Sequence, residues 1–186
     1  MFSKFQGLAI DNRGIIDGTT HKWWVGDCNR DQNHTFHNVP TSFMVYSSSN
    51  VHLRDLKFKD SPKIHVEIAQ STYVEVENLE IVALGNSLNT DRIQVYTSQH
   101  ALIPNCTIAT GDDIESSDIE IRKLRHGISI GSLGSGHSQN TVSDVVVKGA
   151  SVNGAQNGVW IKTWHGLSGY AQLIMFQHVI NIIDKY

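Results

Sequence analysis

The residues best suited to chemistry are acidic, and they fall in two short motifs near the middle of the chain. Asn89-Thr90-Asp91 is followed by Gly111-Asp112-Asp113, at an interval close to the length of an internal repeat. If one motif lay a coil above the other in a repeating fold, the carboxylates would be about 4.8 Å apart, the spacing of neighbouring strands. Carboxylates this close cannot all ionise freely, so one pKa rises and one group stays protonated at mildly acidic pH. Hydrolysis of a glycosidic bond uses such a pair of protonated and ionised carboxyl groups.

A histidine and a lysine follow the aspartates along the chain. His126 opens the glycine-rich run from 126 to 134, and Lys162 ends the run Val159-Trp160-Ile161-Lys162. Each motif also has an ordinary structural explanation. Asn-Thr-Asp and Gly-Asp-Asp are common turn sequences whose side chains cap backbone groups. A histidine before a glycine-rich strand is often structural, and a lone lysine is usually a solvated charge. Their occurrence together, at spacings near the length of the internal repeat, favours a functional role.

The internal repeat predicts the framework that positions these residues. A full copy has apolar residues at positions 1, 3, 6 and 8, usually after a polar turn. Copies start at Val51, Val74, Ala101, Ile119, Val145 and Ile174, and those at Ile119 and Ile174 match only the first three positions. Two apolar residues two apart, a two-residue corner and two more describe two short strands bent around a core. Runs such as 64–68, 93–95 and 159–161 supply a third strand in each repeat. The sequence therefore predicts an all-β, right-handed parallel β-helix, in which each coil needs its neighbours to complete its hydrogen bonding.

The repeat also predicts the domain organisation. We expect one β-helix domain over residues 1–186, with a loop at 19–40, coils from about 47 to 181, and two short strands with a turn between them at 8–18. A β-sandwich or barrel is the alternative, but it would show closely spaced hairpin turns and no long repeat.

Composition excludes several classes of function. Only 18% of the residues are charged, the net charge is −3, and no cluster of lysine or arginine is present, which disfavours nucleic-acid binding. Two distant cysteines, Cys28 and Cys106, define neither a disulfide framework nor a zinc site, and both are expected to be small buried residues. We expect neither a signal peptide nor a membrane span in this chain. A monomer is expected, because the stacking of a β-helix is internal.

Taken in order, the motifs at 89–91, 111–113, 126–134 and 161–164 resemble the signatures of polygalacturonases, family 28 of the glycoside hydrolases, and the plant pectin-degrading branch most closely. The resemblance implies a secreted cell-wall protein that hydrolyses α-1,4-galacturonosyl linkages in pectin with inversion and without a metal or other cofactor. It assigns the general acid to Asp112 and water activation to Asp91 and Asp113. His126 would lie beside the scissile bond, and Asn89 and Lys162 would bind substrate.

Several positions depart from the family pattern. Arg92 replaces a glycine after Asn-Thr-Asp, Arg125 replaces the glycine before the histidine, and Trp160 replaces the arginine before Ile161-Lys162. His126 follows Asp112 closely, as if a strand were deleted, which puts the stacking of His126 over the aspartates in question. The chain resembles a partial or shortened member, incomplete at both ends.

The departures leave alternative functions open. One is a catalytically inactive β-helix that binds pectin or serves as a cell-wall or pollen protein. Another is a hydrolase of the rhamnogalacturonan type, which fits the histidine and lysine motifs less well.

Overall fold

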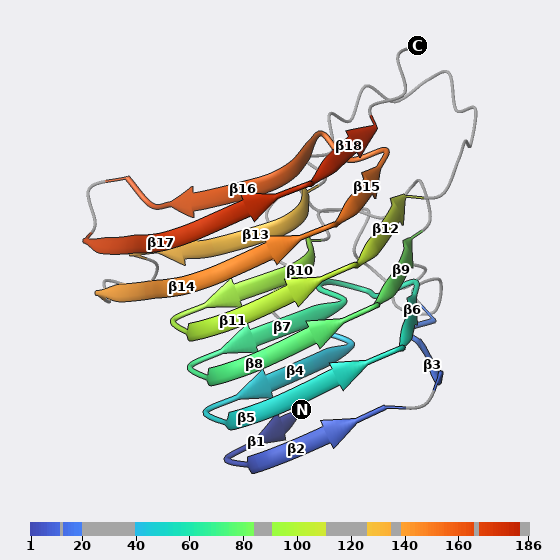
Figure 1. Cartoon of the computed structure of the whole chain (residues 1–186), viewed down its shortest axis with the longest axis horizontal. Coiled ribbons are helices and arrows are strands. Elements are labelled where there is room, and N and C mark those ends of the chain that lie inside the picture. The colour runs from blue at the N-terminus through green and yellow to red at the C-terminus, as the bar shows by residue number, and fades with distance from the viewer. Residues whose placement is uncertain are drawn as a thin grey trace, which may run out of the picture.

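The chain folds as a stack of parallel coils in the computed structural model, which describes residues 1–11, 13–19, 40–83, 91–110, 126–134, 139–165 and 168–182. Three six-stranded parallel sheets account for the regular structure of these residues (Figure 1). No helix in the described ranges has the length and apolarity that a membrane crossing requires. The parallel β-helix predicted from the repeat is therefore confirmed.

Each sheet takes one strand from every coil. Sheet A contains β1 (Phe2–Ser3), β4 (Phe43–Tyr46), β7 (Val66–Ala69), β10 (Asp91–Tyr96), β13 (His126–Leu133) and β16 (Asn157–Thr163). Sheet B contains β2 (Gln6–Ile10), β5 (Ser49–Arg54), β8 (Thr72–Glu77), β11 (Gln99–Pro104), β14 (Asn140–Lys148) and β17 (Gly169–Gln177). Sheet C contains β3 (Ile15–Asp17), β6 (Lys57–Lys59), β9 (Glu80–Ala83), β12 (Thr107–Thr110), β15 (Ser151–Asn153) and β18 (Ile180–Ile182).

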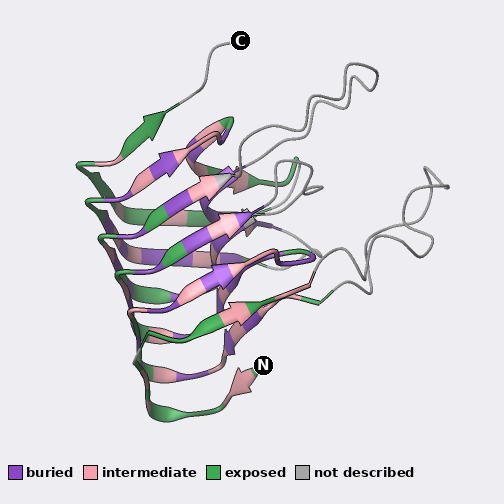
Figure 2. Cartoon of the chain, turned by 90° about the vertical axis from the view of Figure 1, so that its right-hand side faces the viewer, coloured by how far each residue is buried: buried purple, intermediate pink, exposed green. Residues whose placement is uncertain are grey.

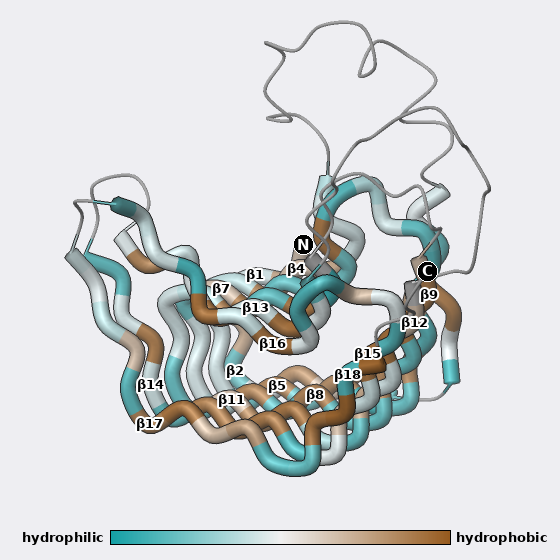
Figure 3. The backbone as a smooth tube through the Cα atoms, turned by 90° about the horizontal axis from the view of Figure 1, so that it is seen from above, coloured by the Kyte–Doolittle hydropathy of each residue, from teal (hydrophilic) through white to brown (hydrophobic). Residues whose placement is uncertain are grey.

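The path of the chain runs from sheet A to sheet B to sheet C and then back to sheet A one level higher. Viewed along the solenoid axis, sheets A and B face each other and sheet C closes one side of the cross-section (Figure 3). Strand connections of this kind between parallel neighbours are right-handed, because a twisted strand packs back onto its sheet only in that way. The fold is thus a right-handed parallel β-helix whose first coil is built by β1, β2 and β3.

The apolar positions of the repeat form the core. The first, second, third and fifth copies of the repeat place all their apolar residues in the buried cluster, namely Val51, Leu53, Leu56, Phe58, Val74, Val76, Leu79, Ile81, Ala101, Ile103, Cys106, Ile108, Val145, Val147, Ala150 and Val152. Buried and exposed residues alternate along the strands, because successive side chains point to opposite faces (Figure 2). In the last coil Ile174 and Val179 are only partly buried, and Phe176 is 36% exposed.

The strands of the third and fifth predicted copies are direct neighbours in sheet B. Ala101 of the third copy pairs directly with Val145 of the fifth, in neighbouring strands β11 and β14. The fourth copy, which starts at Ile119, lies outside the described residues. One coil of the stack therefore runs from Ala101 of the third copy to Val145 of the fifth.

A ladder of buried serines supports the corner between sheets A and B. The hydroxyls of Ser48, Ser71 and Ser98 each donate to the carbonyl two residues earlier, at 2.8 to 2.9 Å. Each hydroxyl also accepts a hydrogen bond of 3.1 Å from a backbone N–H of the coil below, which belongs to Phe5, Ser48 and Ser71 respectively. A buried hydroxyl is costly unless it is paired, and here every serine satisfies backbone groups that the bend leaves open.

Residues with positive φ recur at the same corner of successive coils. Between sheets A and B they are Lys4, Ser47, Gln70 and Thr97, with φ from 47° to 61°. Between sheets B and C they are Arg13, Asp55, Asn78, Asn105, Gly149 and His178. This conformation is uncommon for residues other than glycine. The backbone N–H of several of these corner residues donates to a carbonyl of the adjacent coil, as from Gln70 to Tyr96 at 3.1 Å, and these bonds offset the strain.

The thiol of Cys106 is part of this core and is expected to be chemically inert. Burial raises the pKa of Cys106 from 9.0 to about 11, and its S–H donates to the Val76 carbonyl at 3.4 Å. The protonated thiol therefore makes its full contribution to the free energy of unfolding at pH values below the pKa that Cys106 has in the unfolded chain. That contribution, about 2 to 3 kcal/mol, is lost as the pH rises through about 11. The free-energy difference between the wild type and Cys106→Ala, measured by urea unfolding, should shrink as the pH increases from 8 to 11.

Iodoacetamide labelling followed by peptide mapping checks the same prediction independently, because it distinguishes Cys106 from Cys28. Cys106 should stay unmodified in the folded protein at neutral pH and react after unfolding. Rapid labelling of Cys106 in the folded state would contradict its burial. The burial predicted for Cys106 is confirmed, whereas Cys28 lies outside the described residues.

Candidate active site

Two of the predicted site residues, Asp91 and His126, lie at the corner where the chain passes from sheet C to sheet A. Strands β10, β13 and β16 begin at Asp91, His126 and Asn157, and these three residues are consecutive register partners (Figure 1). Neighbouring strands are about 4.8 Å apart, so the three residues form a column across three coils. His126 therefore lies directly above Asp91, and the short segment before His126 does not prevent this stacking.

The register of the described strands shows which residue lies next to Asp91 in the coil above. β10, β11 and β12 belong to one coil, and Gly111-Asp112-Asp113 follows β12 directly in the chain. The register partner of Asp91 in the next coil of sheet A is His126. The placement of Asp112 and Asp113 relative to Asp91 stays a prediction, because both residues lie outside the described set.

His126 is held firmly in this column. Its side chain is 2% exposed, and its Nδ1 is 3.1 Å from Nδ2 of Asn157. Nδ2 of an asparagine amide is a donor only, so this contact places an acceptor lone pair on Nδ1 and leaves the proton of a neutral ring on Nε2. The Trp160 ring packs on the imidazole in a T-shaped arrangement, with centroids 3.7 Å apart. These contacts fix both the tautomer and the orientation of the imidazole ring.

A second row of side chains crosses the same sheet further along each strand. Glu67, Gln94, Ser129 and Trp160 are consecutive register partners on β7, β10, β13 and β16. Nε2 of Gln94 donates to the Gly131 carbonyl at 2.7 Å, which ties β10 to the strand above. Ser129 is fully buried, and its hydroxyl has no hydrogen-bond partner among the described residues. Nζ of Lys162 lies 5.5 Å from the centre of the Trp160 ring.

Two stacked glycines allow the strands to approach closely beside His126. A Cβ atom at Gly127 would lie 2.5 Å from the Gly158 carbonyl oxygen and 2.9 Å from Cγ1 of Val152. A Cβ atom at Gly158 would lie 2.9 Å from Cβ of Asn181. Because no side chain fits at either position, the glycines after His126 and Asn157 are required by packing.

Arg92, one of the two arginines that depart from the family pattern, is an internal residue. Arg92 directly follows Asp91 and is the largest fully buried side chain of the described residues. A guanidinium removed from water is tolerated only where acceptors surround it. Arg92 consequently adds no cation to the surface that a substrate would meet.

The predicted site residues are only partly covered by the structure. The backbone of Asp91 and the whole of His126 and Lys162 are described, and they come from β10, β13 and β16. The side chain of Asp91 and the residues Asn89, Asp112 and Asp113 lie outside the described set. Sequence reasoning did not single out Asn157, although its place before a strand and a glycine, as in His126-Gly127, was a usable signal.

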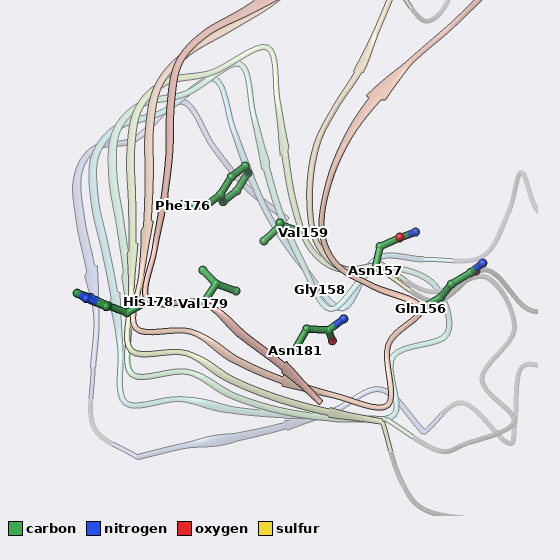
Figure 4. Close-up of a pocket in the computed structure, with 8 residues that line it drawn as sticks. All are labelled: Gln156, Asn157, Gly158, Val159, Phe176, His178, Val179 and Asn181. Atoms are coloured by element: carbon green, nitrogen blue, oxygen red, sulfur yellow. The ribbon is translucent and has the colours of Figure 1, made fainter. Parts of the chain in front are cut away.

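A hollow of about 500 Å³ opens at the end of the stack, beyond this column. It is lined by Gln156, Asn157, Gly158, Val159, Phe176, His178, Val179 and Asn181. Figure 4 shows Val159, Phe176, Val179 and Asn181 pointing into the interior of the last described coil, whereas His178 points away from it. The hollow is therefore the continuation of the apolar core, and its lining carries no carboxylate for acid–base chemistry.

Comparison with known proteins agrees with the fold and the motifs. The model of the family "Glycosyl hydrolases family 28" matches residues 1–183. Polygalacturonase-2 of Solanum lycopersicum is 37% identical over 96% of this chain and 41% of its own length. A probable polygalacturonase of Arabidopsis thaliana is 38% identical over 96% of this chain and 39% of its own length. The chain thus spans about two fifths of the length of the curated relatives it matches.

Solved structures show the same architecture. The endo-xylogalacturonan hydrolase of Aspergillus tubingensis superposes with a TM-score of 0.63 at 21% identity, over 97% of this chain and 54% of that one. The polygalacturonase of Erwinia carotovora superposes with a TM-score of 0.52 at 22% identity, over 76% and 43%. From the family match over almost its whole length, together with the sequence identity to plant polygalacturonases, we conclude that the chain belongs to family 28 of the glycosyl hydrolases.

Proposed function

We propose that this protein hydrolyses α-1,4-galacturonosyl linkages in pectin by an inverting acid–base mechanism, outside the cell and on wall polysaccharide. Family membership and the polygalacturonases among its relatives support the reaction class and the substrate. The observation that carries the proposal for this chain is the column at the corner of sheets C and A, where His126 stacks on Asp91. Gly111-Asp112-Asp113 follows the strand that leads into that corner.

The three aspartates divide the acid and base roles. Asp112 donates a proton to the leaving glycosidic oxygen, and Asp91 with Asp113 deprotonates the attacking water. Inversion requires the acid and the base to be about 6.5 to 9.5 Å apart, so that one water fits between the base and the sugar. Mutual repulsion among neighbouring carboxylates keeps one of them protonated at mildly acidic pH.

His126 and Lys162 support this chemistry from the adjacent coils. His126, oriented by Asn157 and Trp160, presents Nε2 as a hydrogen-bond donor beside the scissile bond and supports the protonated state of Asp112. Lys162 binds a galacturonate carboxylate, which suits a flexible ammonium group facing a polyanion. Asn89 binds substrate next to Asp91.

A pectin-binding protein without catalytic activity is the second candidate, and Trp160 is the observation that favours it. The indole lies above Ser129 and contacts His126 directly, at the position where the sequence pattern that the chain resembles has an arginine. An indole offers one N–H donor and no charge, so it cannot form a bidentate pair with a carboxylate.

The release of reducing ends from polygalacturonic acid at mildly acidic pH tests the proposal. Asp112→Asn should lower the rate by about 10² to 10⁴-fold, because an amide cannot donate the proton that the leaving group needs. Asp55→Asn is the matched control, since Asp55 lies at the corner of sheets B and C and accepts a hydrogen bond from Asn78. Equal rates in the wild type and Asp112→Asn would refute the hydrolase and leave the pectin-binding protein.

A further inference from the structure

The outer face of β16 carries an aromatic ring beside a cation. Trp160 pairs with Ser129 and Ile161 with the fully buried Ile130. Because successive side chains alternate between the two faces of a strand, Trp160 and Lys162 lie together on the face opposite to Ile130. This face also carries the contact between Trp160 and His126, so ring and cation adjoin the proposed catalytic column.

We propose that Trp160 makes this position a subsite for a methyl-esterified galacturonosyl residue, next to a free galacturonate that Lys162 binds. This inference rests on the proposed pectin substrate and adds a preference for partly esterified chains. The distance of 5.5 Å between Nζ of Lys162 and the Trp160 ring centre allows adjacent sugars of one chain to contact both side chains.

The physical reason is the cost of removing a carboxylate from water. A free carboxylate placed against the indole would lose hydration and gain at most one N–H donor, so its binding would be penalised. A methyl ester carries no charge, and its methyl group gains by leaving water for the ring surface. Lys162 supplies the charge partner that one free carboxylate requires.

The residues beneath Trp160 provide no second cation. The register partners in this row are Glu67, Gln94 and Ser129, which are acidic or neutral. Glu67 accepts a hydrogen bond from the Thr41 hydroxyl at 3.0 Å, which holds its carboxylate in place. Among the described residues of this row, a second free galacturonate would meet an acidic group and no basic one, whereas an ester would meet no repulsion.

A further exposed ring lies beyond Lys162. Trp164 is 57% exposed, and its backbone N–H donates to the Leu133 carbonyl at 2.9 Å, which fixes the backbone at the end of β16. An exposed indole beside a cation suits stacking against the apolar face of a sugar ring. Trp160, Lys162 and Trp164 therefore extend the binding surface along the strand.

Binding of galacturonan oligomers of equal length, measured by titration calorimetry, tests the inference. The three probes are unesterified, about half methyl-esterified and fully methyl-esterified oligomers. The wild type should bind the half-esterified oligomer about tenfold more tightly than the unesterified one. Trp160→Arg should reverse this order, and Trp160→Phe, which keeps a ring, should preserve it. Lys162→Ala should remove the advantage of the half-esterified over the fully esterified oligomer.

Tyr170→Arg is the matched control for added charge, because Tyr170 is an exposed aromatic residue on β17 in sheet B. It should leave the order of the three oligomers unchanged. Equal or tighter binding of the unesterified oligomer by the wild type, or no binding of any oligomer, would overturn the subsite. Reducing-end release is recorded on the same oligomers, so hydrolysis without the binding preference overturns only the subsite. The preference without hydrolysis supports the subsite and overturns only the hydrolase.

Discussion

His126→Ala and Asp91→Asn are each expected to lower the rate of reducing-end release from polygalacturonic acid by about 10² to 10⁴-fold. The double variant is expected to be little slower than the slower single variant. His126 and Asp91 are register partners in adjacent coils, and residues that act as one unit show strongly non-additive losses. The loss should fall mainly on kcat, because the proposed mechanism places both groups beside the reacting atoms.

The measurement is a double-mutant cycle on kcat and KM, with thermal unfolding of every variant as a check on the fold. His100→Ala is the matched control, since His100 lies on β11 and stacks on Tyr73, on a different sheet from the column. Losses that multiply in the double variant would show that the two residues act independently. A change in KM alone would assign His126 to substrate binding.

Phe58→Ala is expected to reduce the free energy of unfolding by about 3 to 5 kcal/mol. Phe58 on β6 is fully buried, and its ring meets Phe43 of β4 edge-on, with centroids 5.9 Å apart. Truncation removes this contact between sheets C and A and leaves a cavity in a coil that the coils on both sides cannot easily fill. The loss is expected to be large because each coil of a solenoid is stabilised by its neighbours.

Urea unfolding followed by circular dichroism checks this value. Tyr73→Ala is the control, because Tyr73 is also aromatic but is 58% exposed on β8, and its replacement should cost less than about 1 kcal/mol. A loss at Phe58 as small as that at Tyr73 would show that the coil relaxes into the cavity.

The core could be predicted from the sequence because it depends on a local rule. Inward side chains recur at every second residue along a strand. The burial of Val74 and Val76 can therefore be predicted without knowing which strands pack beside them. The corners could not be predicted in the same way. Ser47 and Gln70 adopt positive φ, which their residue types disfavour, and their backbone N–H groups donate to carbonyls of the adjacent coil.

The same distinction between local features and contacts between coils applies to the candidate site. The β-helix, the buried repeat and the motifs that mark family 28 could be predicted from the sequence, because these are properties of short segments. The three-dimensional structure was needed to show that His126 is the register partner of Asp91 and that Asn157 and Trp160 contact its imidazole ring. Register depends on the length of chain between two stacked strands, and that length cannot be read from a short segment.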